Sequence, residues 1–461
     1  MNNTKKTYEI DMCNGRILGK MLRFAIPLML SSVLQLLFNA ADVAVVGKFA
    51  GDNSLAAVGC TGSLINLLIG LFVGLSIGAN VMAARHYGAK QEEELSNTVH
   101  TAMLVAAIAG IILTAVGMVF TEGILKLMST PKAVLPLASL YMRIYFGGML
   151  ANMIYNFGSA ILRAVGDTRR PMYYLTIAGI VNVILNLVFV IIFKLDVAGV
   201  AIATVISQCI SAVLVVRCLM RETGAIRLSL KKLRIDRKEL LQILRIGLPA
   251  GLQGCVFSLS NVVIQSSVNT FGEIAISGTS AAINLEGFVY VSMNSFYQAT
   301  LSFVSQNFGA GKYDRIKKVA WSGILCVTFT GVLLSHLEVG FGRQLLSIYT
   351  SNPVVIEAGM TRLRINNALY FMCGVMDVLV GVLRGLGQSV LPMIVSLLGA
   401  CGMRLLWIAT VFRIPKYHMI ETVFIAYPIS WTLTAMAHLI CLLVIMRKLR
   451  PMKGLEGVPN L

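Results

Sequence analysis

The sequence predicts an all-α polytopic membrane protein, with twelve transmembrane helices forming two parallel six-helix repeats. Apolar residues make up 57% of the 461 residues and charged residues only 13%, whereas soluble proteins carry about 25% charged residues. The apolar residues fall in long runs, and the chain repeats itself at an offset of 221 or 222 residues. A membrane barrel would instead show short segments of alternating polarity.

Twelve apolar runs are long enough to cross a bilayer, which takes about 20 helical residues each. The stretch from Ala102 to Phe120 is typical, because it contains no charged residue. The first six runs centre on 24–47, 54–84, 97–119, 134–162, 171–193 and 197–220, and the second six on 241–269, 274–305, 316–340, 354–383, 389–412 and 422–446.

Matching residues recur between the two groups of six runs. Six spans return the chain to its starting side, so both halves enter the membrane in the same orientation and the repeat is parallel. Internal repeats of this kind are typical of transporters with a site between their halves. The matching pairs are Gly88 and Gly309, Arg143 and Arg364, Arg163 and Arg384, and Pro171 and Pro392, all 221 apart, and Pro27 and Pro249, which are 222 apart.

The basic residues predict the domain boundaries and the orientation. We expect a tail at 1–19, a lobe at 20–221, a linker at 222–239, a second lobe at 240–449 and a tail at 450–461. The net charge is +18, and most of it lies at span ends on one side. By the positive-inside rule, both tails and the linker are cytoplasmic in a multi-pass cell-membrane protein. This pattern indicates a lipid bilayer as partner and excludes nucleic acid. The linker charges are Arg227, Lys231, Lys232, Arg234, Arg237 and Lys238.

Ionisable residues inside spans need a functional or structural reason. Asp42 is the first; it shares a helix face with Gln35 and Asn39, and its repeat position is the apolar Ile264. This asymmetry favours a role in ion coupling. The alternative is a solvated helix end, since Lys48 is close by.

The fifth and sixth spans carry uncharged polar side chains. Asn182 and Asn186 lie at i and i+4, so they share one helix face, and Thr204 supplies a hydroxyl group from the next span. Hydrogen bonds between helices would explain these residues equally well.

The second half has its own carboxylates, Glu286 and Asp377. A local acid–base pair is the simplest explanation of a membrane arginine. Either carboxylate could therefore neutralise Arg364 or Arg404, or act in transport. Residue patterns for a metal, a nucleotide or a catalytic site are absent. We accordingly expect a transporter rather than an enzyme, with no cofactor and no metal, and nine cysteines that serve in packing.

Several motifs together resemble the multidrug and toxic-compound extrusion (MATE) family. The resemblance covers essentially all twelve spans. It implies two lobes around a central cleft and the export of amphiphilic, often cationic compounds in exchange for H⁺ or Na⁺. Independently of the resemblance, Pro27 and Pro249 are candidate points where helices bend, because proline removes a backbone hydrogen bond. The motifs are 24–27, 42–47, 199–207, 304–311 and the two Leu-Arg-x-x-Gly segments that contain Arg163 and Arg384.

The resemblance also assigns candidate site residues. Relatives form a cation site from a first-helix Asp, an Asn and an Asp of the fifth helix, and a Thr of the sixth; these positions match Asp42, Asn182, Asn186 and Thr204. The fifth-helix acid is therefore an amide here, which puts Na⁺ in doubt at this site. Other relatives use acids in the second lobe. This chain has Gln253 on the seventh helix, together with Asp377 about one turn from the matching position and Glu286 on the eighth.

Three other functions remain open on the sequence. A flippase for lipid-linked or amphiphilic metabolites has a related two-lobe fold, but would favour several arginines in mid-membrane. A membrane enzyme lacks its catalytic residues here, and a channel would show flux without saturation. We expect the protein to act as a monomer on small amphiphilic molecules, for which 23 Met and 20 Phe residues suit an adaptable apolar site.

Overall fold

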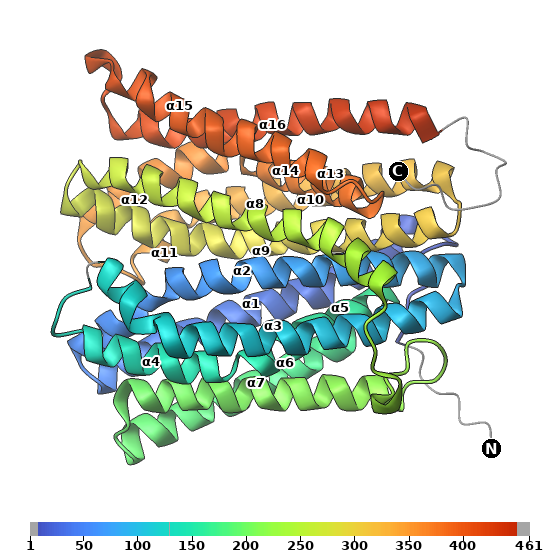
Figure 1. Ribbon diagram of the computed structural model, residues 1–461. Coiled ribbons are helices and arrows are strands. Elements are labelled where there is room, and N and C mark those ends of the chain that lie inside the picture. Colours follow the sequence, from blue (N-terminus) through green and yellow to red (C-terminus); the bar gives the residue numbers. More distant parts are fainter. Residues whose placement is uncertain (1–7, 129, 450–461) are drawn as a thin grey trace. The chain divides into compact units, whose positions relative to one another are not determined.

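The computed structural model describes residues 8–128 and 130–449, and every regular element within these ranges is a helix. The predicted tail 450–461, residue 129 and residues 1–7 of the first tail lie outside the described residues. The helices of the first half are α1 (Ile17–Phe49), α2 (Asp52–Ala89), α3 (Glu92–Leu127), α4 (Leu135–Gly147), α5 (Met149–Ala164), α6 (Arg169–Leu187) and α7 (Asp196–Arg221) (Figure 1).

The second half begins after a short 3₁₀ turn at Leu230–Lys232. A π-helical segment, Leu397–Gly402, continues α14 into α15, as Val188–Ile192 continues α6. The helices are α8 (Arg237–Asn269), α9 (Glu273–Gly309), α10 (Tyr313–Gly340), α11 (Gly342–Leu346), α12 (Pro353–Asn367), α13 (Tyr370–Gly385), α14 (Val390–Ser396), α15 (Met403–Ala409) and α16 (Ile420–Leu449), joined by 3₁₀ turns at Val411–Arg413 and Pro415–Tyr417 (Figure 1).

The all-helical membrane fold is confirmed, but two predicted spans are broken. Within the described ranges, ten helices are long and apolar enough to cross a membrane, and there are eleven spans if α12 and α13, bent by 48° at the break between them, are counted as one. The predicted run 134–162 is divided into α4 and α5 at Gly148. Each piece is shorter than the roughly 20 residues that a straight span needs.

The turns between helices repeat the same backbone conformation in both halves of the chain. Left-handed φ angles favour glycine, which has no Cβ to clash. They occur at equivalent positions in both halves, so the chain reverses direction at matching points. The pairs, each 221 residues apart, are Gly51 (φ 83°) and Gly272 (φ 87°), Lys90 (φ 58°) and Gly311 (φ 66°), and Gly166 (φ 95°) and Gly387 (φ 90°).

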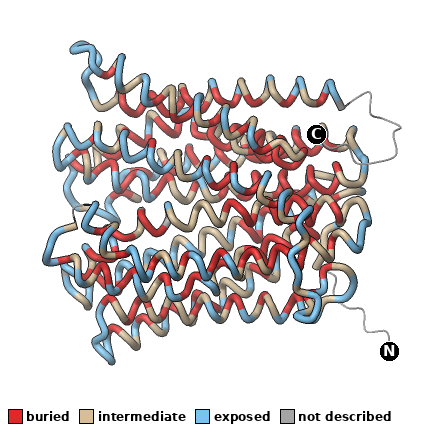
Figure 2. Tube along the Cα trace, viewed as in Figure 1, coloured by how far each residue is buried: buried red, intermediate tan, exposed pale blue. Residues whose placement is uncertain are grey.

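The helices pack into two compact units. The first contains the described residues up to Asp11 together with Leu30–Gly251, and the second contains Met12–Met29 and the described chain from Leu252 onward. Buried and exposed residues alternate along the long helices (Figure 2). Many exposed residues are large and apolar, such as Val119 and Phe329, as expected for helices surrounded by lipid.

The described part of the predicted N-terminal tail is packed against protein. In the first unit, the Tyr87 hydroxyl donates to the Glu9 carboxylate at 2.9 Å. In the second unit, the Asn307 amide donates to the Met12 carbonyl at 3.1 Å and Lys312 Nζ to the Cys13 carbonyl at 3.0 Å. Residues 8–15 are therefore held by both side-chain and backbone hydrogen bonds before α1 begins.

Candidate ion-coupling site

The four polar residues singled out in the first half lie together in the first unit. The Asn186 amide donates to Asp42 Oδ1, which joins α6 to α1. The same amide lies 3.4 Å from Asn182 Oδ1. Asn182 Nδ2 in turn donates to Thr204 Oγ1 on α7 at 3.4 Å. A continuous chain of polar contacts thus crosses three helices.

Burial differs along this chain of contacts. Asn182 and Asn186 are buried, whereas Asp42 and Thr204 are partly exposed. The carbonyl oxygen Oδ1 of Asn186 is buried and accepts no hydrogen bond. Buried polar atoms are normally paired, so this oxygen is available to a donor that the four side chains do not now supply.

A glycine brings α1 and α6 close enough for this contact. A Cβ atom at Gly179 would lie 1.8 Å from Cε2 of Phe38, which no real side chain tolerates. Gly179 precedes Asn186 by about two helical turns and Phe38 precedes Asp42 by about one. The missing side chain at Gly179 therefore allows Asp42 to reach Asn186.

Two tyrosines of α4 complete the surroundings of Asp42, and nothing in the sequence pointed to them. Tyr141 and Tyr145 are stacked with their ring centroids 6.0 Å apart. Both interact electrostatically with Asp42. They lie on an apolar helix where aromatic side chains are ordinary packing residues, so only the tertiary structure identifies them.

In the second unit, Glu286 is neutralised by an arginine that was not anticipated. Nε of Arg362 donates to Glu286 Oε1 at 3.0 Å and Nη2 donates to Oε2 at 2.8 Å, in a buried bidentate pair. Asn366 also donates to Glu286 Oε1 at 3.0 Å. The alternative in which Glu286 neutralises Arg364 or Arg404 is not what the structure shows, because α12 presents Arg362 rather than Arg364 to α9.

The two anticipated arginines have other partners. Arg364 is exposed and contacts Glu357 at 2.8 Å. Arg404 is buried, and its guanidinium lies 4.3 Å from the ring centroid of Tyr427 and 5.6 Å from that of Trp431. Within the described ranges it forms no carboxylate pair. Aromatic faces stabilise a desolvated cation, so they take the place of an acid at Arg404.

Asp377 and Gln253 are associated with a third arginine, Arg384. Arg384 donates to Gln253 Oε1 at 2.8 Å and to the Tyr297 hydroxyl at 2.7 Å. Asp377 lies about two turns before Arg384 on α13 and interacts electrostatically with Arg384 and Tyr290. These two candidates therefore belong to one buried network, while Glu286 belongs to another.

A further buried carboxylate, Glu338 on α10, was missed. The Asn367 amide donates to Glu338 Oε2 at 3.2 Å, and Glu338 Oε1 is buried without a hydrogen-bond partner. Its position near the end of a predicted span hid it, because acids at helix ends are usually solvated.

Pro27 and Pro249 lie inside α1 and α8. No cluster of three or more metal-binding side chains occurs among the residues described.

The comparisons with known proteins decide the family. The MatE family model matches residues 27–188 and 249–408. The chain belongs to the MATE family. It is 28% identical over 420 residues to the Probable multidrug resistance protein YoeA of Bacillus subtilis, covering 89% of this chain and 90% of that one. It is 26% identical over 352 residues to a FAD transporter of Shewanella oneidensis, covering 74% and 76%.

A solved MATE-like structure shares the fold. A MOP superfamily transporter from Pyrococcus furiosus superposes with a TM-score of 0.89, at 22% identity, covering 95% of this chain and 98% of that one. This MATE protein is thus a multi-pass membrane protein of a multidrug efflux family, and its fold is that of a transporter rather than an enzyme.

Gly179→Leu is expected to reduce drug efflux by this MATE protein to near the level of cells that lack it. The added side chain displaces the Phe38 ring from its place between α1 and α6, and we expect this repacking to weaken the contact between Asp42 and Asn186. Gly123→Leu is the matched control, because nothing lies within 4 Å of a Cβ at that position. Dye efflux at equal membrane expression measures the effect. Equal efflux by the two variants would show that close packing of α1 on α6 is not required.

Proposed function

We propose that this MATE protein is a secondary antiporter that exports amphiphilic cations in exchange for H⁺ by alternating access. The observation that carries the proposal is the contact between one carboxylate, Asp42, and the neutral amide of Asn186. Hard metal cations are bound by several oxygen ligands, often from more than one carboxylate. A site with a single acid can carry one proton, which favours H⁺ over Na⁺.

The two side chains offer hydrogen bonds in both protonation states. With Asp42 ionised, the Asn186 amide donates to it. A protonated Asp42 becomes a donor, and the unpaired Oδ1 of Asn186 is then an acceptor once the amide rotates. Protonation thus changes the partner atoms between α1 and α6. We propose that this change, with bending of α1 at Pro27 and of α8 at Pro249, switches the protein between its two access states.

The proposal also covers the membrane orientation, the buried ion pair of the second unit and the functional unit. We place both termini and the linker in the cytoplasm, and we assign the buried pair of Glu286 and Arg362 to stability rather than to coupling. Each buried charge there has a direct partner, as expected of a structural pair. The functional unit is a monomer in the lipid bilayer, without a cofactor.

Export of an anionic aromatic metabolite is the second candidate function. One observation favours it: a relative is named a FAD transporter. Efflux of FAD, measured in parallel with efflux of a cationic dye, distinguishes the two substrate classes.

The test of the proposal uses the purified protein in proteoliposomes. With an imposed pH gradient and no Na⁺, we expect saturable transport of a lipophilic cationic dye. With a Na⁺ gradient at equal pH on both sides, we expect only the leak seen in empty liposomes. Transport that requires Na⁺ would overturn the assignment of H⁺, and transport driven by neither gradient would overturn antiport.

A further inference from the structure

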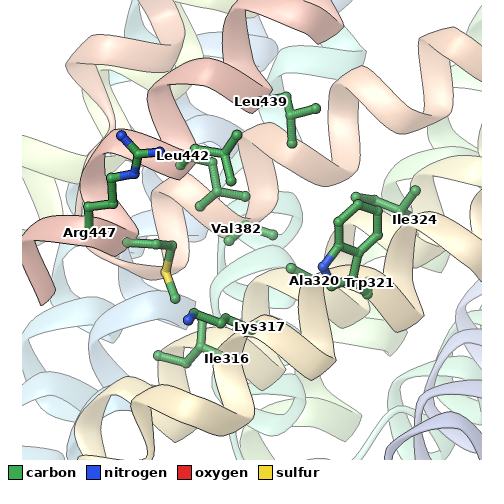
Figure 3. A pocket seen from close by; sticks show the side chains of 11 residues that line it. Ile316, Lys317, Ala320, Trp321, Ile324, Val382, Leu439, Leu442 and Arg447 are labelled. Carbon is green, nitrogen blue, oxygen red and sulfur yellow. The ribbon is translucent and has the colours of Figure 1, made fainter. Parts of the chain in front are cut away.

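The second unit contains a pocket that none of the assigned roles uses. Its volume is about 330 Å³, which is at the lower end of the roughly 300–1,000 Å³ of small-molecule sites. Helices α10 and α16 form its two sides, and Val382 of α13 lies between them (Figure 3). Val382 and Ala320 are buried, so the pocket has an apolar floor.

The lining is divided between a basic end and an apolar end. Lys317 lies in the first turns of α10, and Arg447 in the last turn of α16. Both line the pocket (Figure 3), so the two positive charges share one end. From Lys317 the lining continues to Ile324, about 10 Å further along α10, and from Arg447 to Leu439, about 12 Å along α16. The pocket is therefore amphiphilic along its length.

The two basic side chains are not neutralised within the part of the chain that the structure describes. Neither Lys317 nor Arg447 forms an ion pair there, although other basic residues near the start of α10 have protein partners. Lys312 binds the Cys13 carbonyl and Arg315 binds the Asn14 carbonyl, at 3.0 Å and 2.9 Å. The positive charge at the pocket can therefore be neutralised by an anion that is not part of the described chain.

We propose that this pocket binds an anionic phospholipid. Its phosphate lies between Lys317 and Arg447, and one acyl chain follows the apolar wall past Trp321 and Leu443 toward Leu439. Basic pockets between membrane helices are suited to anionic head groups, and each nearby Lys or Arg adds to the attraction. The apolar length requires a lipid, because a free phosphate would use only the basic end. On the proposed orientation this end faces the cytoplasmic leaflet, where anionic lipids are plentiful.

Native mass spectrometry of the full-length protein in detergent tests the proposal, with dioleoylphosphatidylglycerol and dioleoylphosphatidylcholine as probes. We expect one phosphatidylglycerol molecule to be retained at concentrations where phosphatidylcholine is lost. The double variant K317Q/R447Q should weaken phosphatidylglycerol binding roughly thirtyfold, which corresponds to about 2 kcal/mol. Both positions are at least partly exposed, so the variant should fold.

The matched control is K318Q/K448Q, which removes the same charge from adjacent positions that do not line the pocket. It should bind phosphatidylglycerol like the unmodified protein. Equal weakening in the two double variants would overturn the proposal in favour of a diffuse basic surface. Equal retention of the two lipids by the unmodified protein would also overturn it. A320F, which fills the apolar floor, should weaken binding with all charges intact; unchanged binding would show that the acyl chain lies elsewhere.

Discussion

Asp42→Asn is expected to abolish dye transport driven by a pH gradient, down to the leak of empty liposomes. The substitution keeps the size of the side chain and a hydrogen bond to Asn186 remains possible, so the packing of α1 on α6 is preserved. It removes the one group of the polar chain that can bind and release a proton. An uncoupled protein could still bind substrate, so dye binding should persist while accumulation is lost.

Glu122→Gln is the control for this experiment. Glu122 is a partly exposed carboxylate near the end of α3, paired with Lys126 at 2.8 Å. Exposed pairs of this kind contribute little to stability, and we expect full transport. Unchanged gradient-driven transport in Asp42→Asn would contradict the proposed mechanism. Loss of dye binding together with transport would instead assign Asp42 to the substrate.

Glu286→Gln is expected to destabilise the protein by about 3 kcal/mol, since breaking a buried ion pair leaves an uncompensated charge. Arg362 would keep its cation–π contacts with the rings of Phe424 and Tyr427, 5.4 and 5.2 Å away. It would no longer have an acid bonded to it. Arg362→Gln should cost a similar amount. The double variant should recover much of the loss, because neither charge then remains. Apparent melting temperatures in detergent measure all three.

Glu357→Gln is the matched control, because its carboxylate is exposed and its contacts with Arg343 and Arg364 are at the surface. It should shift the melting temperature little. If Glu286→Gln melts like this control yet transports no dye, the pair acts in transport, and the structural assignment fails. A double variant that is less stable than both single variants would contradict the charge-compensation argument.

The sequence predicted the repeat well because several of the repeated residues occupy positions that require a particular backbone conformation. Gly166 and Gly387 have left-handed φ angles, and few other residue types adopt them without strain. The spans could be predicted because lipid imposes a length and a polarity on every crossing helix. The breaks at Gly148 and between α12 and α13 could not, because each run is long enough to cross the membrane as one helix and a bend is set by packing rather than by composition.

The residues of the candidate site could be predicted from the sequence, but the contacts between them could not. Asp42, Asn182 and Asn186 stood out because charges and amides are costly in a span. Their meeting depends on Gly179 lying against Phe38, and glycine is common in membrane helices for many reasons. Tyr141 and Tyr145 could not be recognised at all, since aromatic residues on an apolar helix carry no polar signal.

By itself, the sequence determined the fold class, the two-fold repeat, the membrane spans and the chemical difference between the halves, because these follow from local polarity and spacing. Only the tertiary structure decided which charges are paired. Arg362 rather than Arg364 reaches Glu286, and aromatic rings rather than an acid surround Arg404. A pair depends on which helix faces meet, and residues two positions apart on a helix point in different directions, so no spacing along the chain could select the partner.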